Sequence, residues 1–247
     1  NGEQGGQGRV EEENDGPFKY GMQFNQRTIR QAFIRKVFFL VTIMLGVMAT
    51  MTALPFFFPQ IKQNFLRGGN VAWFYGAYGL FFATYMVLIC CESVRRSFPM
   101  NIILTAVFTV ATGFMTMCLS MQFSTESVLI ALITVTVCCA IIIIFSIQTK
   151  YDLTSCMGVL AILGMFLFVF GIVAMIGTMF FHARILHTIY AGVAALLFMA
   201  YLAVDVQLLM GGRKYAISPE DHIFAAVQLF TDILQIFWMI LQLFGSR

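Results

Sequence analysis

Long apolar runs follow one another along this chain, and their length constrains the fold more than any other feature. Each covers about 20 residues, which is the length that a helix needs to cross the hydrocarbon core of a bilayer. Because 60% of the 247 residues are hydrophobic and only 11% are charged, a soluble domain of this size has no core large enough to hide them. The sequence therefore predicts an all-α polytopic membrane protein with seven spans. The expected spans are 33–58, 73–91, 100–121, 127–147, 156–181, 185–210 and 223–244.

Residues 1–26 differ from everything that follows, because they are rich in Gly, Glu and Gln and poor in apolar side chains. This composition predicts a disordered tail, with residues 27–247 forming the transmembrane domain. The first apolar run is too long and too deep in the chain for a cleaved signal peptide. We therefore expect it to be a retained span.

Basic residues gather at alternate ends of the runs, which predicts a cytosolic amino terminus. In that orientation Asp205 lies about a turn and a half inside the cytosolic boundary and Asp232 lies close to the midplane, at 1.5 Å per residue. The cytosolic set is Arg27, Arg30, Arg35, Lys36, Arg95, Arg96, Lys150, Arg213 and Lys214, and the opposite set is Lys62, Arg67, Arg184 and Arg247.

The sequence offers little sign of other chemistry. Its net charge of +3 comes from residues at span ends, so no nucleic-acid partner is expected. The six cysteines have neither the spacing of a zinc site nor that of a disulfide framework, and we interpret them as packing residues. Palmitoylation at Cys90 or Cys91 is the alternative. We expect no tightly bound cofactor and no enzyme activity.

The turn between the last two runs has the residues of two helix ends. The glycines at 211–212 are expected to end the sixth span. Ser218 is expected to cap the seventh span, with Pro219 in its first position. Glu220 and Asp221 then suit the positive end of that helix, so we do not count them as ion ligands.

Two aspartates lie inside apolar runs, Asp205 in the sixth and Asp232 in the seventh. A carboxylate in the middle of a membrane helix costs about 2.5 to 3.5 kcal/mol on insertion scales, so two of them in one hairpin indicate a function. Because their expected depths differ by about a turn, contact between the two carboxyls stays open at this point.

Two carboxyls in a site of low dielectric constant cannot both ionise easily, so they share a proton. Such a pair can sense protons, and when it is fully ionised it attracts a divalent cation. A divalent cation such as calcium takes about six to eight oxygen ligands, so two carboxyls, Asp205 and Asp232, predict a transient site in a pathway and not a tight store. The structural alternative is that each carboxyl bonds a neighbour such as Thr231, Gln207 or Gln235.

Arg95 and Arg96 end the second span on the same side as Asp205. A guanidinium at that depth is able to pair with Asp205 as a latch that protonation of the carboxylate releases. Arg95 is the first choice for the latch and Arg96 the weaker one. The simpler interpretation, sufficient for at least one of them, is an anchor of the positive-inside kind. Glu92 lies one turn earlier and is an alternative partner for both.

Separated motifs occur from about residue 27 to the end of the chain. They are Thr28–Val37, Cys90–Cys91 followed by Arg95–Ile103, Gln148–Cys156, and Ile217–Asp221 followed by Phe230–Asp232. These motifs resemble the lifeguard branch of the transmembrane Bax inhibitor motif family, and their occurrence in the family's order makes the resemblance specific.

The resemblance implies a compact seven-helix bundle with the last helix at its centre, in endomembranes such as the endoplasmic reticulum, Golgi or lysosome. It also implies a pH-sensitive leak of calcium ions that lowers stored calcium and inhibits apoptosis, with apoptosis-regulating membrane proteins as partners. By motif, the family's paired aspartates fall on Asp205 and Asp232 and its latch arginine on Arg95. The family usually has Tyr where this chain has Val204, which puts any hydrogen bond from that phenol in doubt.

Two other classes of function remain open. A diaspartyl intramembrane protease also places one Asp on each of two adjacent helices. Its second aspartate is expected in Gly-x-Gly-Asp, whereas Leu229 and Thr231 occupy the glycine positions here. A membrane scaffold that binds apoptotic or receptor partners without conducting ions is the other alternative, with the tail before Asn25 as its interacting part.

Overall fold

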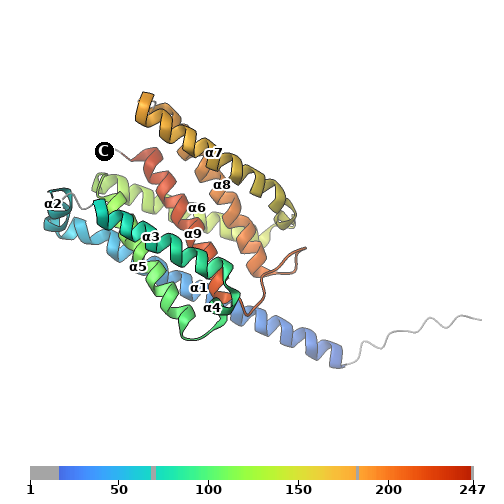
Figure 1. Cartoon of the computed structure of the whole chain (residues 1–247). Coiled ribbons are helices and arrows are strands. Elements are labelled where there is room, and N and C mark those ends of the chain that lie inside the picture. Colours follow the sequence, from blue (N-terminus) through green and yellow to red (C-terminus); the bar gives the residue numbers. More distant parts are fainter. Residues whose placement is uncertain (1–16, 68–70, 182–183, 246–247) are drawn as a thin grey trace, which may run out of the picture.

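The structure is a computed structural model that describes residues 17–67, 71–181 and 184–245, and Figure 1 shows these as a bundle of helices. Seven of the helices, α1, α3 and α5 to α9, are long and apolar enough to cross a membrane, which confirms the predicted fold class. The elements are α1 (Pro17–Phe57), α2 (Pro59–Arg67), α3 (Val71–Cys90), α4 (Glu92–Arg96), α5 (Met100–Ser120), α6 (Thr125–Gln148), the 3-10 turn η1 (Leu153–Cys156), α7 (Met157–Phe181), α8 (Arg184–Met210) and α9 (His222–Phe244).

The first helix is longer than the sequence predicts. α1 begins at Pro17, so it includes the last ten residues of the segment that was expected to be a disordered tail. Residues 1–16 of that expected tail lie outside the described residues. α1 therefore contains both the basic segment and the apolar part that follows it.

Two short helices occupy segments that were expected to be connections. α2 follows α1 directly, with Pro59 in its first position, where the missing N–H leaves no hydrogen bond unmade. α4 carries Arg95 and Arg96 in its last turn, between α3 and α5. Their lengths, nine and five residues, are too short for the hydropathy of the sequence to reveal them.

The last helix is the centre of the bundle. α9 packs against α1, α3, α5, α6 and α8, and Figure 1 shows it in red between its neighbours. In the most apolar segment of α9, 67% is buried, whereas in the corresponding segment of the α7 span only 11% is buried. A helix that is surrounded in this way places any polar side chain that it carries inside the protein.

Stacked aromatic rings hold α3 and α5 against α9. The ring centroids of Phe81 and Phe108 lie 5.5 Å apart, and Phe230 meets Phe108 edge-on at 5.8 Å. Tyr85 stacks on Phe81 at 5.9 Å. Because such pairs add to the free energy of apolar burial, they fix the distance between α3 and α9, where the site described below is found.

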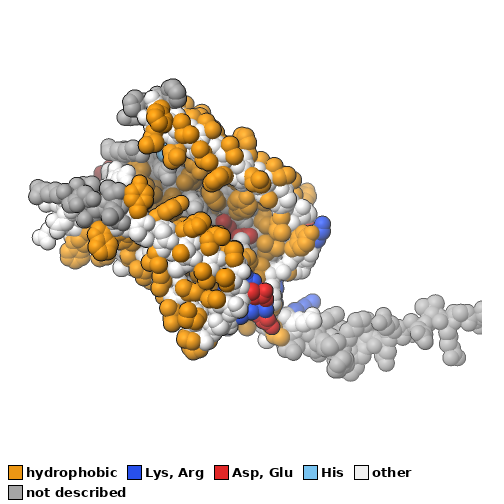
Figure 2. All heavy atoms as spheres, in the orientation of Figure 1, with side chains coloured by type: hydrophobic (Ala, Val, Ile, Leu, Met, Phe, Trp, Pro, Cys, Tyr) orange, Lys and Arg blue, Asp and Glu red, His pale blue; other side chains and the backbone are white. Residues whose placement is uncertain are grey.

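The sides of the bundle are apolar, and the charges gather toward one end (Figure 2). The Arg213 guanidinium donates to the carbonyls of Thr149 and Lys150, so the α6–α7 connection and the α8–α9 turn meet there. Arg96 of α4 is hydrogen-bonded to Asp221 of the same turn. The connections that carry most of the predicted cytosolic cations therefore lie together.

Candidate functional site

The antiparallel pair α8 and α9 brings Asp205 and Asp232 together. Both side chains are buried, with residue exposures of 7% and 8%. A side-chain hydrogen bond joins the two carboxyls, which requires a proton on one of them. The structure therefore answers the question of contact that the sequence left open.

The different depths of the two aspartates do not keep their carboxyls apart. Asp205 lies five residues before Met210, the end of α8, and Asp232 lies ten residues after His222, the start of α9. At 1.5 Å per residue these positions are about 8 Å and about 15 Å from that end of the bundle. Side chains lean toward the amino end of their own helix, so in antiparallel helices these two lean toward each other.

The partners of the carboxyls differ from those that the sequence suggested. Gln228 donates from Nε2 to Oδ2 of Asp205 at 3.3 Å. Thr231 instead donates to the Val227 carbonyl at 2.7 Å, and Gln207 binds backbone groups of the α6–α7 connection. Oδ2 of Asp232 is buried and has no hydrogen-bond partner among the residues that the structure describes.

A cavity of about 380 Å³ extends from the carboxyl pair between α3, α8 and α9. Figure 2 shows acidic atoms in a hollow of the apolar face at this place. The lining combines five aromatic side chains with oxygen-bearing polar groups, and none of these residues is basic. The lining residues are Phe81, Phe82, Tyr85, Phe198, Tyr201, Asp205, Gln228, Thr231, Asp232 and Gln235.

Tyrosines reach the cavity from positions that the sequence analysis did not single out. Val204, where the family usually has Tyr, is buried at 4% exposure. Tyr201 lines the cavity one turn before Asp205 and donates its hydroxyl to the Leu160 carbonyl at 2.7 Å. The spacing of four residues between Tyr201 and Asp205 was the signal that could have identified Tyr201, because residues at this spacing share one face of a helix. Tyr85 comes from α3, and no pattern in the sequence connects it with the site.

The carboxyl pair is not a closed metal site. No group of three or more acidic, His or Cys side chains able to hold a metal ion occurs in the described part of the chain. Besides Asp205 and Asp232, the oxygens that line the cavity are neutral ones from amides and hydroxyls. This donor set fits passing contact with a hydrated cation rather than tight binding, because calcium takes about six to eight oxygens.

The arginines of the expected latch bind Asp221 and not Asp205. Nε of Arg95 lies 3.1 Å from Oδ1 of Asp221, and Arg96 makes two contacts of 2.9 Å with the same carboxylate. Arg95 also donates to the Ile89 carbonyl at 2.9 Å and lies over the ring of Phe224. The sequence prediction of Asp205 as the latch partner is therefore wrong for this structure.

The position of Asp221 explains this choice of partner. α9 begins at His222, so Asp221 precedes the helix, and the predicted start at Ser218 and Pro219 is wrong. At this level Arg96 stays partly solvated, whereas pairing with Asp205 would take a guanidinium about 8 Å deeper. Hydrogen bonds from Arg96, and then from Arg95, hold the pKa of Asp221 below its ordinary value, although burial opposes them.

Arg96 is also part of a wider ion-pair cluster. It lies 2.6 Å from Glu92, as the sequence suggested, and 3.3 Å from Glu220. We call Arg95, Arg96 and Asp221 the α4–α9 latch. It ties the short helix α4 to the amino end of the helix that carries Asp232.

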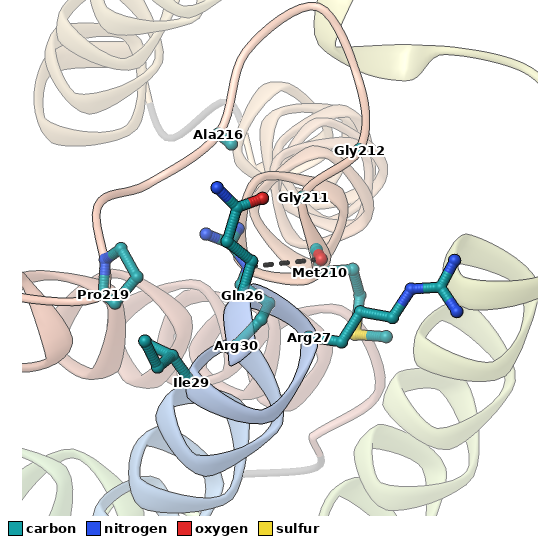
Figure 3. Close-up of a pocket in the computed structure, with 9 residues that line it drawn as sticks. All are labelled: Gln26, Arg27, Ile29, Arg30, Met210, Gly211, Gly212, Ala216 and Pro219. Atoms are coloured by element: carbon teal, nitrogen blue, oxygen red, sulfur yellow. Dashed lines mark hydrogen bonds between the residues drawn. The ribbon is translucent and has the colours of Figure 1, made fainter. Parts of the chain in front are cut away.

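A third arginine, Arg30 of α1, holds the other end of the α8–α9 turn. Its guanidinium donates to the carbonyls of Leu208, Met210 and Ile217 at 2.7, 3.3 and 2.6 Å, and Figure 3 shows it reaching Met210 beside a surface pocket. Gly211, with φ of 71°, turns the chain at this point and confirms the predicted end of the helix. The sequence analysis had taken Arg30 only for a topology signal.

Fold and site together define a multi-pass helical membrane protein in which the last two spans enclose a hydrogen-bonded pair of carboxyls. The model of the family described as "Bax1-I: Inhibitor of apoptosis-promoting Bax1" matches residues 30–247. The chain therefore belongs to this family of anti-apoptotic membrane proteins.

Individual relatives agree with the lifeguard branch that the motifs predicted. The chain is 43% identical to protein lifeguard 3 of Homo sapiens over 91% of its length and 72% of the relative. It is 41% identical to protein lifeguard 3 of Mus musculus over the same shares. Protein lifeguard 4 of Mus musculus is 26% identical over 87% of this chain and 84% of the relative.

Proposed function

We propose that this protein is a pH-sensitive calcium leak channel of intracellular membranes that modulates calcium homeostasis and inhibits apoptosis. The observation that carries the proposal is the hydrogen-bonded pair Asp205 and Asp232, buried in a cavity between spans. Membership of an anti-apoptotic family supports the cellular part. The endoplasmic reticulum, Golgi and lysosome are the membranes that we propose, with calcium ions and protons as the transported or sensed species.

The pair works as a proton-controlled ion contact. With one shared proton, the carboxyls hydrogen-bond and hold α8 and α9 together. When both ionise, two negative charges repel each other and favour a divalent cation between the helices. Neutral oxygens of Gln228, Thr231 and Gln235 add ligands without adding charge, so the cation binds weakly enough to leave.

The α4–α9 latch closes the route on the side that we propose to be cytosolic. Asp221, Phe224, Gln228 and Asp232 follow one another at intervals of three or four residues, which places them along one face of α9. The ion pair with Arg95 therefore lies above the carboxyl pair on the same path. Opening this route requires α4 to move away from α9, and the carboxyl pair then meets the cytosol.

Calcium flux into liposomes tests the proposal directly. We expect vesicles that contain the protein to leak calcium in a pH-dependent way, because a one-proton switch changes an ionised fraction by up to about tenfold per pH unit. Asp232→Asn and Asp205→Asn each remove the shared proton and should flatten this pH response. Asp152→Asn is the matched control, because Asp152 caps η1, away from the cavity.

The same assay separates the rival functions. Vesicles with the wild-type protein that leak no faster than empty ones would favour the non-conducting scaffold. A diaspartyl protease shares the close contact of two aspartates on adjacent helices, as seen here. Cleavage of a transmembrane peptide that Asp232→Asn abolishes would favour the protease, although Leu229 and Thr231 stand where its glycines are expected.

A further inference from the structure

The cavity beside the carboxyl pair is lined by acidic groups without a basic partner. Thr231 already donates its hydroxyl proton to a backbone carbonyl, so its oxygen is left with lone pairs. Asp205 and Asp232 add carboxylate oxygens, and Oδ2 of Asp232, which is buried, has no partner among the described residues. With acceptors on its walls and no Lys or Arg in its lining, the cavity is complementary to a donor that carries positive charge.

The remaining walls are aromatic. Phe81 and Tyr85 of α3 lie on one side and Phe198 and Tyr201 of α8 on the other, so both sides of the cavity carry aromatic rings. Aromatic rings attract an ammonium group and also pack against an alkyl chain. Bare calcium gains little from these aromatic walls, because it prefers oxygen ligands on every side.

The cavity opens on the apolar face of the molecule, where Figure 2 shows acidic atoms in a hollow. Its two sides come from α3 and α8, and Phe82, which lines it, is 54% exposed. In a membrane-spanning bundle such an apolar face meets lipid. A ligand that enters from the bilayer must therefore bring an apolar chain with it, and about 380 Å³ lies within the range of small-ligand sites.

We propose that this cavity binds a single-chain amphiphile with a protonated amine headgroup. The ammonium donates to Asp205, Asp232 and the neighbouring hydroxyl oxygens, and the chain lies along the aromatic walls toward the bilayer. Binding of the amine stands independently of the leak. That the bound amine blocks calcium flux is a consequence that rests on the proposed function.

Equilibrium binding of radiolabelled dodecylamine to the full chain in lipid nanodiscs tests the proposal. We expect saturable binding of one amine per protein, with dodecanol of equal chain length failing to compete. Butylamine should compete at least about tenfold less well, since it lacks the chain that partitions into lipid. Equal competition by dodecanol would overturn the amine headgroup, and equal competition by butylamine would overturn entry from the bilayer.

Two pairs of variants locate the site. Asp232→Asn should weaken dodecylamine binding about tenfold or more, because it removes a charge-assisted hydrogen bond, whereas Asp152→Asn should not. Phe198→Ala should weaken it about threefold, and Phe168→Ala, which removes a 70% exposed ring of α7 outside the cavity, should not. Binding that survives both cavity substitutions would place the amine elsewhere and overturn the proposal.

Failure of this inference and failure of the proposed function are distinguishable. Calcium leak without saturable dodecylamine binding overturns the amine site and leaves the channel. Saturable binding without leak keeps the amine site and removes the channel. If both occur, dodecylamine should slow the leak of the wild-type protein at concentrations that saturate binding, and an unchanged leak would separate the amine site from the ion route.

Discussion

Asp221 is a carboxylate whose charge stays constant over the physiological pH range. Its folded-state pKa is lowered by hydrogen bonds from Arg96 and Arg95, so the stability that the pair contributes is present above the ordinary Asp pKa. That contribution is lost only as the pH falls through the lowered folded-state value. Between about pH 5 and pH 8 the latch therefore stays ionised, so the pH response that we propose for the leak has to come from another group.

Asp221→Asn should change the amount of leak and not its dependence on pH. The substitution removes the charge that holds α4 to α9, so we expect faster calcium flux at every pH and an apparent melting temperature lower by about 2 to 4 °C. The pH midpoint of the flux should remain that of the wild type. Flux and thermal unfolding of the same purified sample measure both effects.

Glu220→Gln is the matched control for that substitution. Glu220 contacts Arg96 at 3.3 Å but is 73% exposed at its side chain, so its loss should leave flux and melting nearly unchanged. A shift of the pH midpoint in Asp221→Asn equal to that in Asp232→Asn would mean that the latch itself senses protons. The division of roles proposed above would then fail.

At this scale the sequence revealed the costly residues but not their partners. Asp205 and Asp232 were predictable because a carboxyl in an apolar run costs free energy wherever it points. Which carboxylate Arg95 meets depends on depth, because Asp221 lies just before α9 begins, whereas Asp205 lies about 8 Å deeper in α8. Gln228 and Tyr85 carry no such cost signal, so only the packing of α3, α8 and α9 identifies them.

At the scale of elements, the end of α8 depends on a side chain from α1. The last carbonyls of a helix have no partner within it, and Arg30 supplies donors to those of Leu208 and Met210. The same guanidinium binds Ile217, so it clasps the turn that leads into α9. The positions of the two aspartate-bearing helices relative to one another therefore depend on α1 as well.

Arg30→Ala should destabilise the protein by about 2 to 4 kcal/mol, because several charge-assisted hydrogen bonds to part-buried carbonyls are lost together. Arg30→Lys should recover only part of this loss, since an ammonium cannot reproduce the fork of a guanidinium. Arg27→Ala is the control, an exposed arginine beside the same pocket. Denaturant unfolding in detergent micelles measures the free energy of unfolding of all three variants. Equal losses for Arg27→Ala and Arg30→Ala would contradict the role of Arg30 at the α8–α9 turn.

The elements themselves were predictable to different degrees. The long spans were predictable, because a segment of about 20 apolar residues can satisfy its backbone hydrogen bonds in lipid only as a helix. The end of α8 at Gly211 was also predictable, since a positive φ favours glycine. The span 223–244 agrees with α9, but its predicted cap was wrong, because Ser218 and Pro219 form a turn before the helix. Ser and Pro are favoured in turns as well as at helix starts.

At the scale of the molecule, contacts gather the cationic connections at one end. Arg213 binds the carbonyls of the α6–α7 connection, Arg95 binds the start of α9, and Arg30 binds the end of α8. The positive-inside rule reads such a concentration as the cytosolic end. The rule by itself uses only the uneven distribution of Lys and Arg between the two ends. The contacts add that the cationic ends of α1, α4, α6 and α8 lie at the same end of the bundle.

Labelling of single cysteines tests this orientation and the number of crossings together. α6, α7 and α8 lie between Gln122, in the α5–α6 connection, and Lys214, in the α8–α9 turn, so three crossings place these exposed residues on opposite sides. Cys90, Cys91 and Cys156 are exposed and would first be replaced by serine. In cells with only the plasma membrane opened, an impermeant maleimide should label Lys214→Cys at once and Gln122→Cys only after detergent. Labelling of Gln122→Cys alone would invert the proposed orientation. Labelling of both from one side would mean that one of the three apolar helices does not cross, and the proposed seven-span topology would then fail.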